Sequence, residues 1–73
     1  MRVAIVKAAR DDDAGVWNVE HSDLAGLHVE GETFEKLCSN VKDAVGDLLE
    51  GAGAVDVAIE IIVHASVRAA VAA

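Results

Sequence analysis

The chain has 73 residues, enough for one domain and too few for two, and a core of that size leaves a domain marginally stable by itself. Thirteen acidic and six basic residues give a net charge of −7, which opposes contact with phosphate backbones and argues against direct nucleic-acid binding. The single cysteine excludes an internal disulfide, so added stability must come from self-association or a partner.

The start of the chain lacks the basic, apolar and small-residue pattern of a signal peptide. The longest apolar stretch, Ala58 to Val63, is interrupted by Glu60 and falls far short of the roughly 20 residues that a membrane-spanning helix needs. We therefore expect a cytoplasmic protein with no membrane span.

Three strands are expected in the first half of the chain. Residues 2–10 are mostly apolar, with β-branched Val3, Ile5 and Val6, which predicts a strand with both faces at least partly covered. A polar turn ending at Gly15 leads to a second strand over 16–22, where Trp17, Val19 and His21 alternate with the other side chains. A short third strand is expected over 27–31.

A helix is the clearest element of the sequence, over residues 34–50, with Thr33 as its N-cap. Gly51 and Gly53 are expected to end it. Its apolar stripe consists of Phe34, Leu37, Cys38, Val41, Val45, Leu48 and Leu49.

A fourth strand is expected over 55–65, because apolar residues occupy every odd position from Val55 to Ala65. The tail 66–73 is compatible with a strand extension, a helical turn or disorder. Together the elements predict an α+β fold, a four-stranded mixed sheet in the order 3-2-1-4 with one helix on one face. The last strand would then be a long apolar edge, and we expect a homodimer or higher homo-oligomer through it.

Residues 23–50 resemble the HicB-like antitoxin family, including its very short relatives of unknown function. The resemblance covers about residues 3–63 and is most specific from Asp23 to Thr33, where an aspartate, a glycine step and a glycine-acid-threonine helix start follow one another. Ala25 stands where the family has proline, and the chain contains no room for the operator-binding segment typical of the family. The resemblance implies a partial ribonuclease-H-like fold and a surface that covers a basic, RNA-cleaving toxin of the HicA kind.

No catalytic, cofactor-binding or metal-binding residue is predicted, so we expect a protein that is not an enzyme. Asp11 to Asp13 lack the spacing of a calcium loop, and the three histidines lie in different strands. Cys38 lies on the apolar stripe and is expected to serve packing. The candidate partner or oligomer interface comprises Trp17, Asn18, Glu20, Asp56, Glu60, Ile62 and His64, although a lone tryptophan in a small domain is more often a core residue.

Three functions remain open from the sequence. The first is an acidic domain that covers a basic protein partner, and the second is a self-assembling structural module with no toxin partner. The third, a small-molecule sensor or minimal enzyme, requires a pocket between helix and sheet near Cys38.

Overall fold

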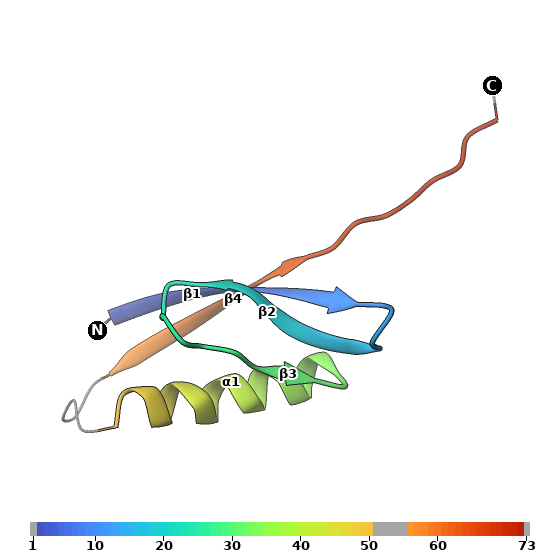
Figure 1. Cartoon of the computed structure of the whole chain (residues 1–73). Helices are drawn as coiled ribbons and strands as arrows, with labels where there is room; N and C mark the ends of the chain where they lie inside the picture. The colour runs from blue at the N-terminus through green and yellow to red at the C-terminus, as the bar shows by residue number, and fades with distance from the viewer. Residues whose placement is uncertain (1, 51–55, 73) are drawn as a thin grey trace.

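The structure, a computed structural model, describes residues 2–50 and 56–72. Its strands form one mixed sheet in the order β3-β2-β1-β4, in which β4 runs parallel to β1 and the other pairs are antiparallel. The helix lies along one face of this sheet (Figure 1). The elements are β1 (Arg2–Asp11), β2 (Val16–Ser22), β3 (Glu30–Gly31), α1 (Phe34–Leu48) and β4 (Val57–His64). The predicted α+β topology is confirmed.

The turn between β1 and β2 is held by one aspartate. The Asp11 carboxylate accepts hydrogen bonds from the backbone N–H groups of Asp13 and Ala14, both at 3.1 Å. Gly15 closes the turn with a φ of 69°, a conformation that favours glycine, and donates its N–H to the Asp11 carbonyl at 2.8 Å.

A bulge in β2 changes which face one histidine occupies. Lys7 pairs with His21 and Ala8 pairs with Val19, so the register shifts by one residue between them. An extra residue in one strand places the following side chains on the opposite face from that given by simple alternation. His21 therefore shares a face with Lys7, and the prediction that it lies on the side of Trp17 and Val19 is wrong.

The third strand is shorter than predicted, spanning Glu30–Gly31 instead of 27–31. Leu24 and Leu27 are buried in the core, and the turn between them uses Gly26 at a φ of 83°. The segment before Glu30 follows the path that inserts these leucines under the sheet. The Val29 carbonyl still accepts a hydrogen bond from the Val19 N–H at 3.2 Å, but regular pairing with β2 begins only at Glu30.

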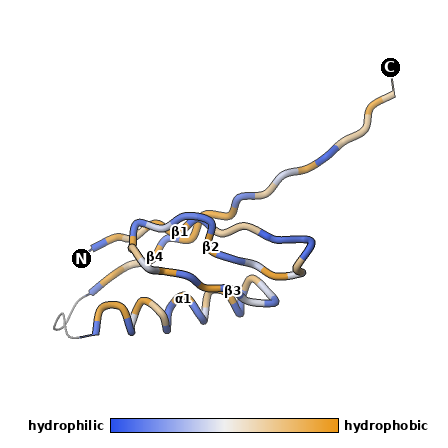
Figure 2. Tube along the Cα trace, viewed as in Figure 1, coloured by the Kyte–Doolittle hydropathy of each residue, from blue (hydrophilic) through white to orange (hydrophobic). Residues whose placement is uncertain are grey.

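The helix begins as predicted at Thr33, whose side chain accepts a hydrogen bond from the Lys36 N–H at 3.0 Å. It ends at Leu48, two residues earlier than predicted, and Gly51, Gly53 and the predicted start of β4 at residue 55 lie outside the described residues. Figure 2 shows hydrophobic and hydrophilic segments alternating along it.

The buried line of α1 is narrower than the predicted stripe. It consists of Leu37, Val41 and Val45, which recur at a spacing of four residues and face the sheet. Cys38 follows Leu37 by about 100° around the axis and is only partly buried, and Leu48 is 46% exposed. The predicted stripe is therefore only partly buried at Cys38 and exposed at Leu48.

The core lies between α1 and the sheet. Val6, Leu37 and Val41 are its largest fully buried side chains. They lie between the helix and the sheet.

Candidate interaction surface

The sheet presents to solvent the face opposite α1. On β1, Ala4, Val6 and Ala8 point toward the helix and are buried, so the alternate residues point the other way. The registers with β2 and β4 extend this face across the sheet. We call the open face the set Val3, Ile5, Lys7, Ala9, Asn18, Glu20, His21, Ala58, Glu60, Ile62 and His64.

Large apolar side chains are exposed on the open face. Val3 is 51% exposed, Ile5 41% and Ile62 51%. Val3 and Ile5 pair with Ala58 and Glu60 of β4, and the pairing of β1 with β2 begins at the next residue, Val6. An apolar sheet face is ordinarily covered by a second layer of structure, and a bare one indicates a contact surface.

A hydrogen bond between a histidine and a glutamate side chain crosses the open face. His64 Nδ1 lies 2.8 Å from Glu20 Oε2, which connects β4 to β2 across the intervening β1. This hydrogen bond from His64 holds the pKa of Glu20 below its ordinary value, and the charges of His64 and Lys7 act in the same direction. Since both side chains are partly exposed, the pair orients these groups more than it stabilises the fold.

Acidic groups surround the apolar side chains. Glu60 is exposed and pairs in register with Ile5. Asp23 lies beyond the end of β2, where its carboxylate accepts a hydrogen bond from the Ile5 N–H at 2.9 Å. With Lys7 as the basic residue of the open face, this region carries more negative than positive charge.

The structure brings together five of the seven predicted interface residues and separates two. Trp17 lies on the helix side, where its ring meets that of Phe34 edge to face, with centroids 5.3 Å apart and an interplanar angle of 69°. Asp56 precedes β4, and its carbonyl accepts from the Arg2 N–H at 3.1 Å. The five that share the open face are Asn18, Glu20, Glu60, Ile62 and His64.

Sequence reasoning missed Val3, Ile5, Lys7 and His21 as members of this surface. The apolar run of β1 predicts a strand with both faces at least partly covered, yet one 15-residue helix can cover only one face of the sheet. The sequence predicts only one helix, and this could have identified Val3 and Ile5 as residues of an uncovered sheet face. His21 could not have been identified, because the bulge leaves no mark in the alternation.

Two features are absent from the part of the chain that the structure describes. Residues 2–50 and 56–72 contain no group of three or more histidine, cysteine, aspartate or glutamate side chains placed to hold a metal ion. In the same ranges no helix has the length and apolar character required to cross a bilayer.

These features define the class of the protein as a small α+β domain, a four-stranded sheet with one helix and one bare face. The chain belongs to the family described as Domain of unknown function (DUF1902), whose model matches residues 3–73.

A solved structure shares the fold. It is the crystal structure of the hypothetical protein TTHA1013 from the extremely thermophilic bacterium Thermus thermophilus. The similarity has a TM-score of 0.76 and 31% sequence identity, and covers 92% of this chain and 99% of that one. A search of curated proteins found no match. These findings support membership in a family of unknown function and do not extend to the HicB-like antitoxins.

Proposed function

We propose that this chain is a non-enzymatic, cytoplasmic protein-binding domain that covers a basic protein partner with its open face, as a HicB-type antitoxin covers its toxin. The observation that carries this proposal is the open face itself. It combines exposed Val3, Ile5 and Ile62 with the carboxylates of Glu20 and Glu60. A contact surface of this kind pairs an apolar centre with charged surroundings that select the partner.

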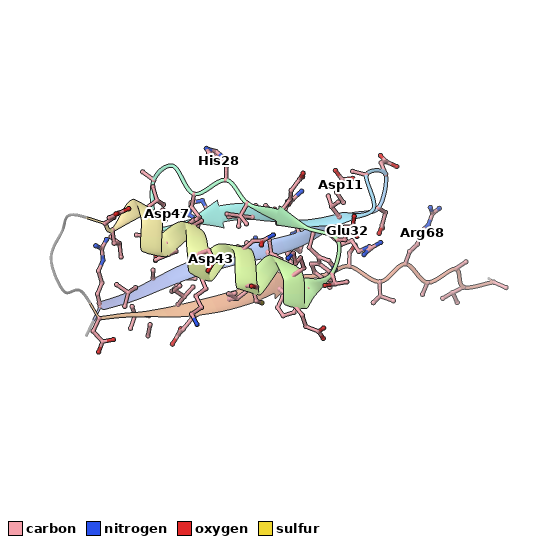
Figure 3. All side chains as sticks on the ribbon, turned by 90° about the horizontal axis from the view of Figure 1, so that it is seen from below. Asp11, His28, Glu32, Asp43, Asp47 and Arg68 are labelled. Atoms are coloured by element: carbon pink, nitrogen blue, oxygen red, sulfur yellow. The ribbon has the colours of Figure 1, made fainter. Side chains whose placement is uncertain are left out.

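The charge of the whole chain supports a basic partner. A net charge of −7 raises the rate of encounter with a positive surface and lowers it for a negative one. Exposed acidic residues also line the helix, including Asp43 and Asp47, which Figure 3 labels. An RNA-cleaving toxin must carry basic groups that hold RNA phosphates, so an acidic cover could block it with no chemistry of its own.

The resemblance to HicB-like antitoxins adds a second line of support. Asp23, Gly26, Gly31, Glu32 and Thr33 stand at the positions that carry it. In this fold Asp23 bonds β1, Gly26 turns the chain and Thr33 caps the helix, so each of these three has a structural task.

The experiment is light scattering coupled to size exclusion. The purified chain is run alone and with each small basic protein encoded beside its gene, at low and moderate salt. We expect a complex whose stability falls as salt rises. If the mass of the chain is unchanged by every such neighbour, the antitoxin-like function is refuted.

A pair of variants distinguishes docking from general charge attraction. Ile5→Lys changes the charge by +1 at the centre of the open face, and Asp43→Lys changes it by +2 on the exposed side of α1. We expect Ile5→Lys to weaken the complex more, even though it alters the net charge less. If Asp43→Lys weakens it equally or more, the open face is not the docking surface.

The alternative function is a self-assembling structural module that has no toxin partner. The observation that favours it is the position of β4 at the edge of the sheet, where its outer backbone groups are free of pairing with the other strands. An oligomer that ignores every basic neighbour in the same experiment would support this alternative.

A further inference from the structure

The last segment of the described chain leaves the domain as an extended arm, residues 65–72. All eight residues are exposed, with Val67 at 94% and Val71 at 87%. Figure 1 shows the arm continuing beyond β4 and away from the sheet, and the molecule measures 59 Å along its longest axis but only 23 and 19 Å across. The radius of gyration is 14.9 Å, against about 11 Å for a compact domain of this length.

The composition of the arm is that of a β-strand paired with another strand. Its sequence ASVRAAVA contains one charged residue, and extending the alternation of β4 through the arm would place Val67 and Val71 on the helix side. Such a segment gains little by staying in water, since its backbone groups and valines remain exposed there.

The arm does not fold back on its own β4. It leaves the sheet as an extended segment, and Ser66 is the only residue among 65–72 of a type that favours tight turns. The free edge of β4 is therefore available to the arm of another molecule. The backbone of the arm can in turn pair with the β4 edge of that molecule.

We propose that residues 65–72 form an exchanged arm, which pairs antiparallel with the β4 edge of a second copy of this chain and receives that copy's arm on its own β4. β4 and the arm each contain eight residues, so one two-fold axis near their junction pairs both at once. The two sheets then join into one continuous sheet of eight strands. The free edges of both β4 strands are satisfied together.

Symmetry and charge fix the register. A two-fold axis perpendicular to the sheet places the helices of both copies on the same side of the joined sheet. Opposed residues of antiparallel strands also point to the same side, so an odd-numbered residue must face an odd-numbered one and an even-numbered residue an even-numbered one. Glu60 is the charged carboxylate of β4, and Arg68 is the charged residue of the arm. Figure 3 shows Arg68 on the arm, away from the rest of the domain. Setting them opposite places the axis at His64.

This register also matches the apolar residues of the two copies. Ile61 then faces Val67 of the second copy, and Val57 faces its Val71. Cross-strand pairs of β-branched residues and pairs of opposite charge each favour strand association, and the symmetry makes every pair twice. Of the open face, only the residues of β4 at the edge, such as Glu60 and His64, take part in this contact, whereas Val3 and Ile5 on β1 remain uncovered. Arg68→Glu lies outside the open face and therefore tests the exchanged arm separately from the proposed partner.

The test measures the dimer dissociation constant of the full chain by sedimentation equilibrium. Arg68→Glu and Glu60→Arg each oppose like charges across both symmetric contacts. We expect each single variant to raise the dissociation constant about tenfold or more. The double variant restores the pair with its signs exchanged, and its constant should return to within about threefold of the original. Circular dichroism confirms that each variant is folded.

A cross-linking measurement checks the register directly. In a Cys38→Ser background, the variant with Ile61→Cys and Val67→Cys should form disulfide-linked dimers on mild oxidation, since opposed residues lie within disulfide reach. The matched control, Ile61→Cys with Val71→Cys, opposes neither cysteine to the other and should link poorly. A monomeric chain, a dimer indifferent to Arg68→Glu, a double variant that stays weak, or equal linking by the control would each overturn the proposal.

Discussion

Replacing Gly31 with alanine tests how closely β3 approaches the first turn of α1. A Cβ atom at this position would lie 2.6 Å from the Leu37 N and 3.0 Å from both the Leu37 Cα and the Lys36 carbonyl carbon. All three are backbone atoms, so no flexible side chain can move aside. Gly31 does not have a positive φ, and the effect of alanine is therefore one of space alone.

The expected cost follows from the overpacking that the substitution forces. Strand β3 has to move away from α1, which costs about 1–3 kcal/mol of unfolding free energy. For a domain of this size each kcal/mol lowers the melting temperature by about 4–8 °C. Thermal and urea unfolding followed by far-ultraviolet circular dichroism measure both quantities.

Gly46→Ala is the matched control. Gly46 lies inside α1, is exposed, and a Cβ atom there meets nothing within 4 Å. Alanine should stabilise the helix by about 0.5–1 kcal/mol, so the two substitutions have opposite signs. If Gly31→Ala is neutral or stabilising, the close approach of β3 to α1 is not present in the molecule.

Two further predictions concern Asp23 and the pair of Glu20 and His64. Asp23→Ala removes the acceptor of the Ile5 N–H, so hydrogen exchange at that amide should become faster and the fold should lose about 1 kcal/mol; unchanged exchange would contradict this role. Replacing His64 with alanine removes the main cause of the lowered Glu20 pKa, which should rise toward its ordinary value of 4.5 in a carboxyl NMR titration. Because the fold lowers this pKa, the interaction stabilises the protein above the ordinary value and is lost as pH falls through the lowered one. A Glu20 pKa that is the same in both proteins would show that the pair does not form.

The element order followed from local patterns. The alternation of odd-numbered apolar residues before Ala65 required a strand, and the spacing of Leu37, Val41 and Val45 required a helix with one apolar side. A three-strand meander followed by a helical crossover leaves few ways to arrange the strands. This is why the strand order 3-2-1-4 could be predicted from the amino-acid sequence.

The membership of the open face could be predicted only in part. Glu20, Glu60 and Ile62 follow from alternation, because the period of two assigns each to a face. Alternation also separates Trp17 from Asn18 and Glu20, because it places Trp17 on the side of Val19. The bulge that moves His21 depends instead on contacts between residues far apart in the chain. Such contacts leave no local pattern.

The sequence by itself determined the types of the main elements, their order and the face of each regular strand, since these depend on periods of two and 3.6 residues that are written along the chain. The tertiary structure alone decided the length of β3, the face of His21 and the exposure of the arm. Each of these depends on how distant segments share space: Leu24 and Leu27 enter the core before regular pairing with β2 begins, and residues 65–72 find no surface of their own molecule to cover. Local periodicity does not show which surfaces the rest of the chain leaves uncovered. In this protein those surfaces are the open face and the free edge of β4.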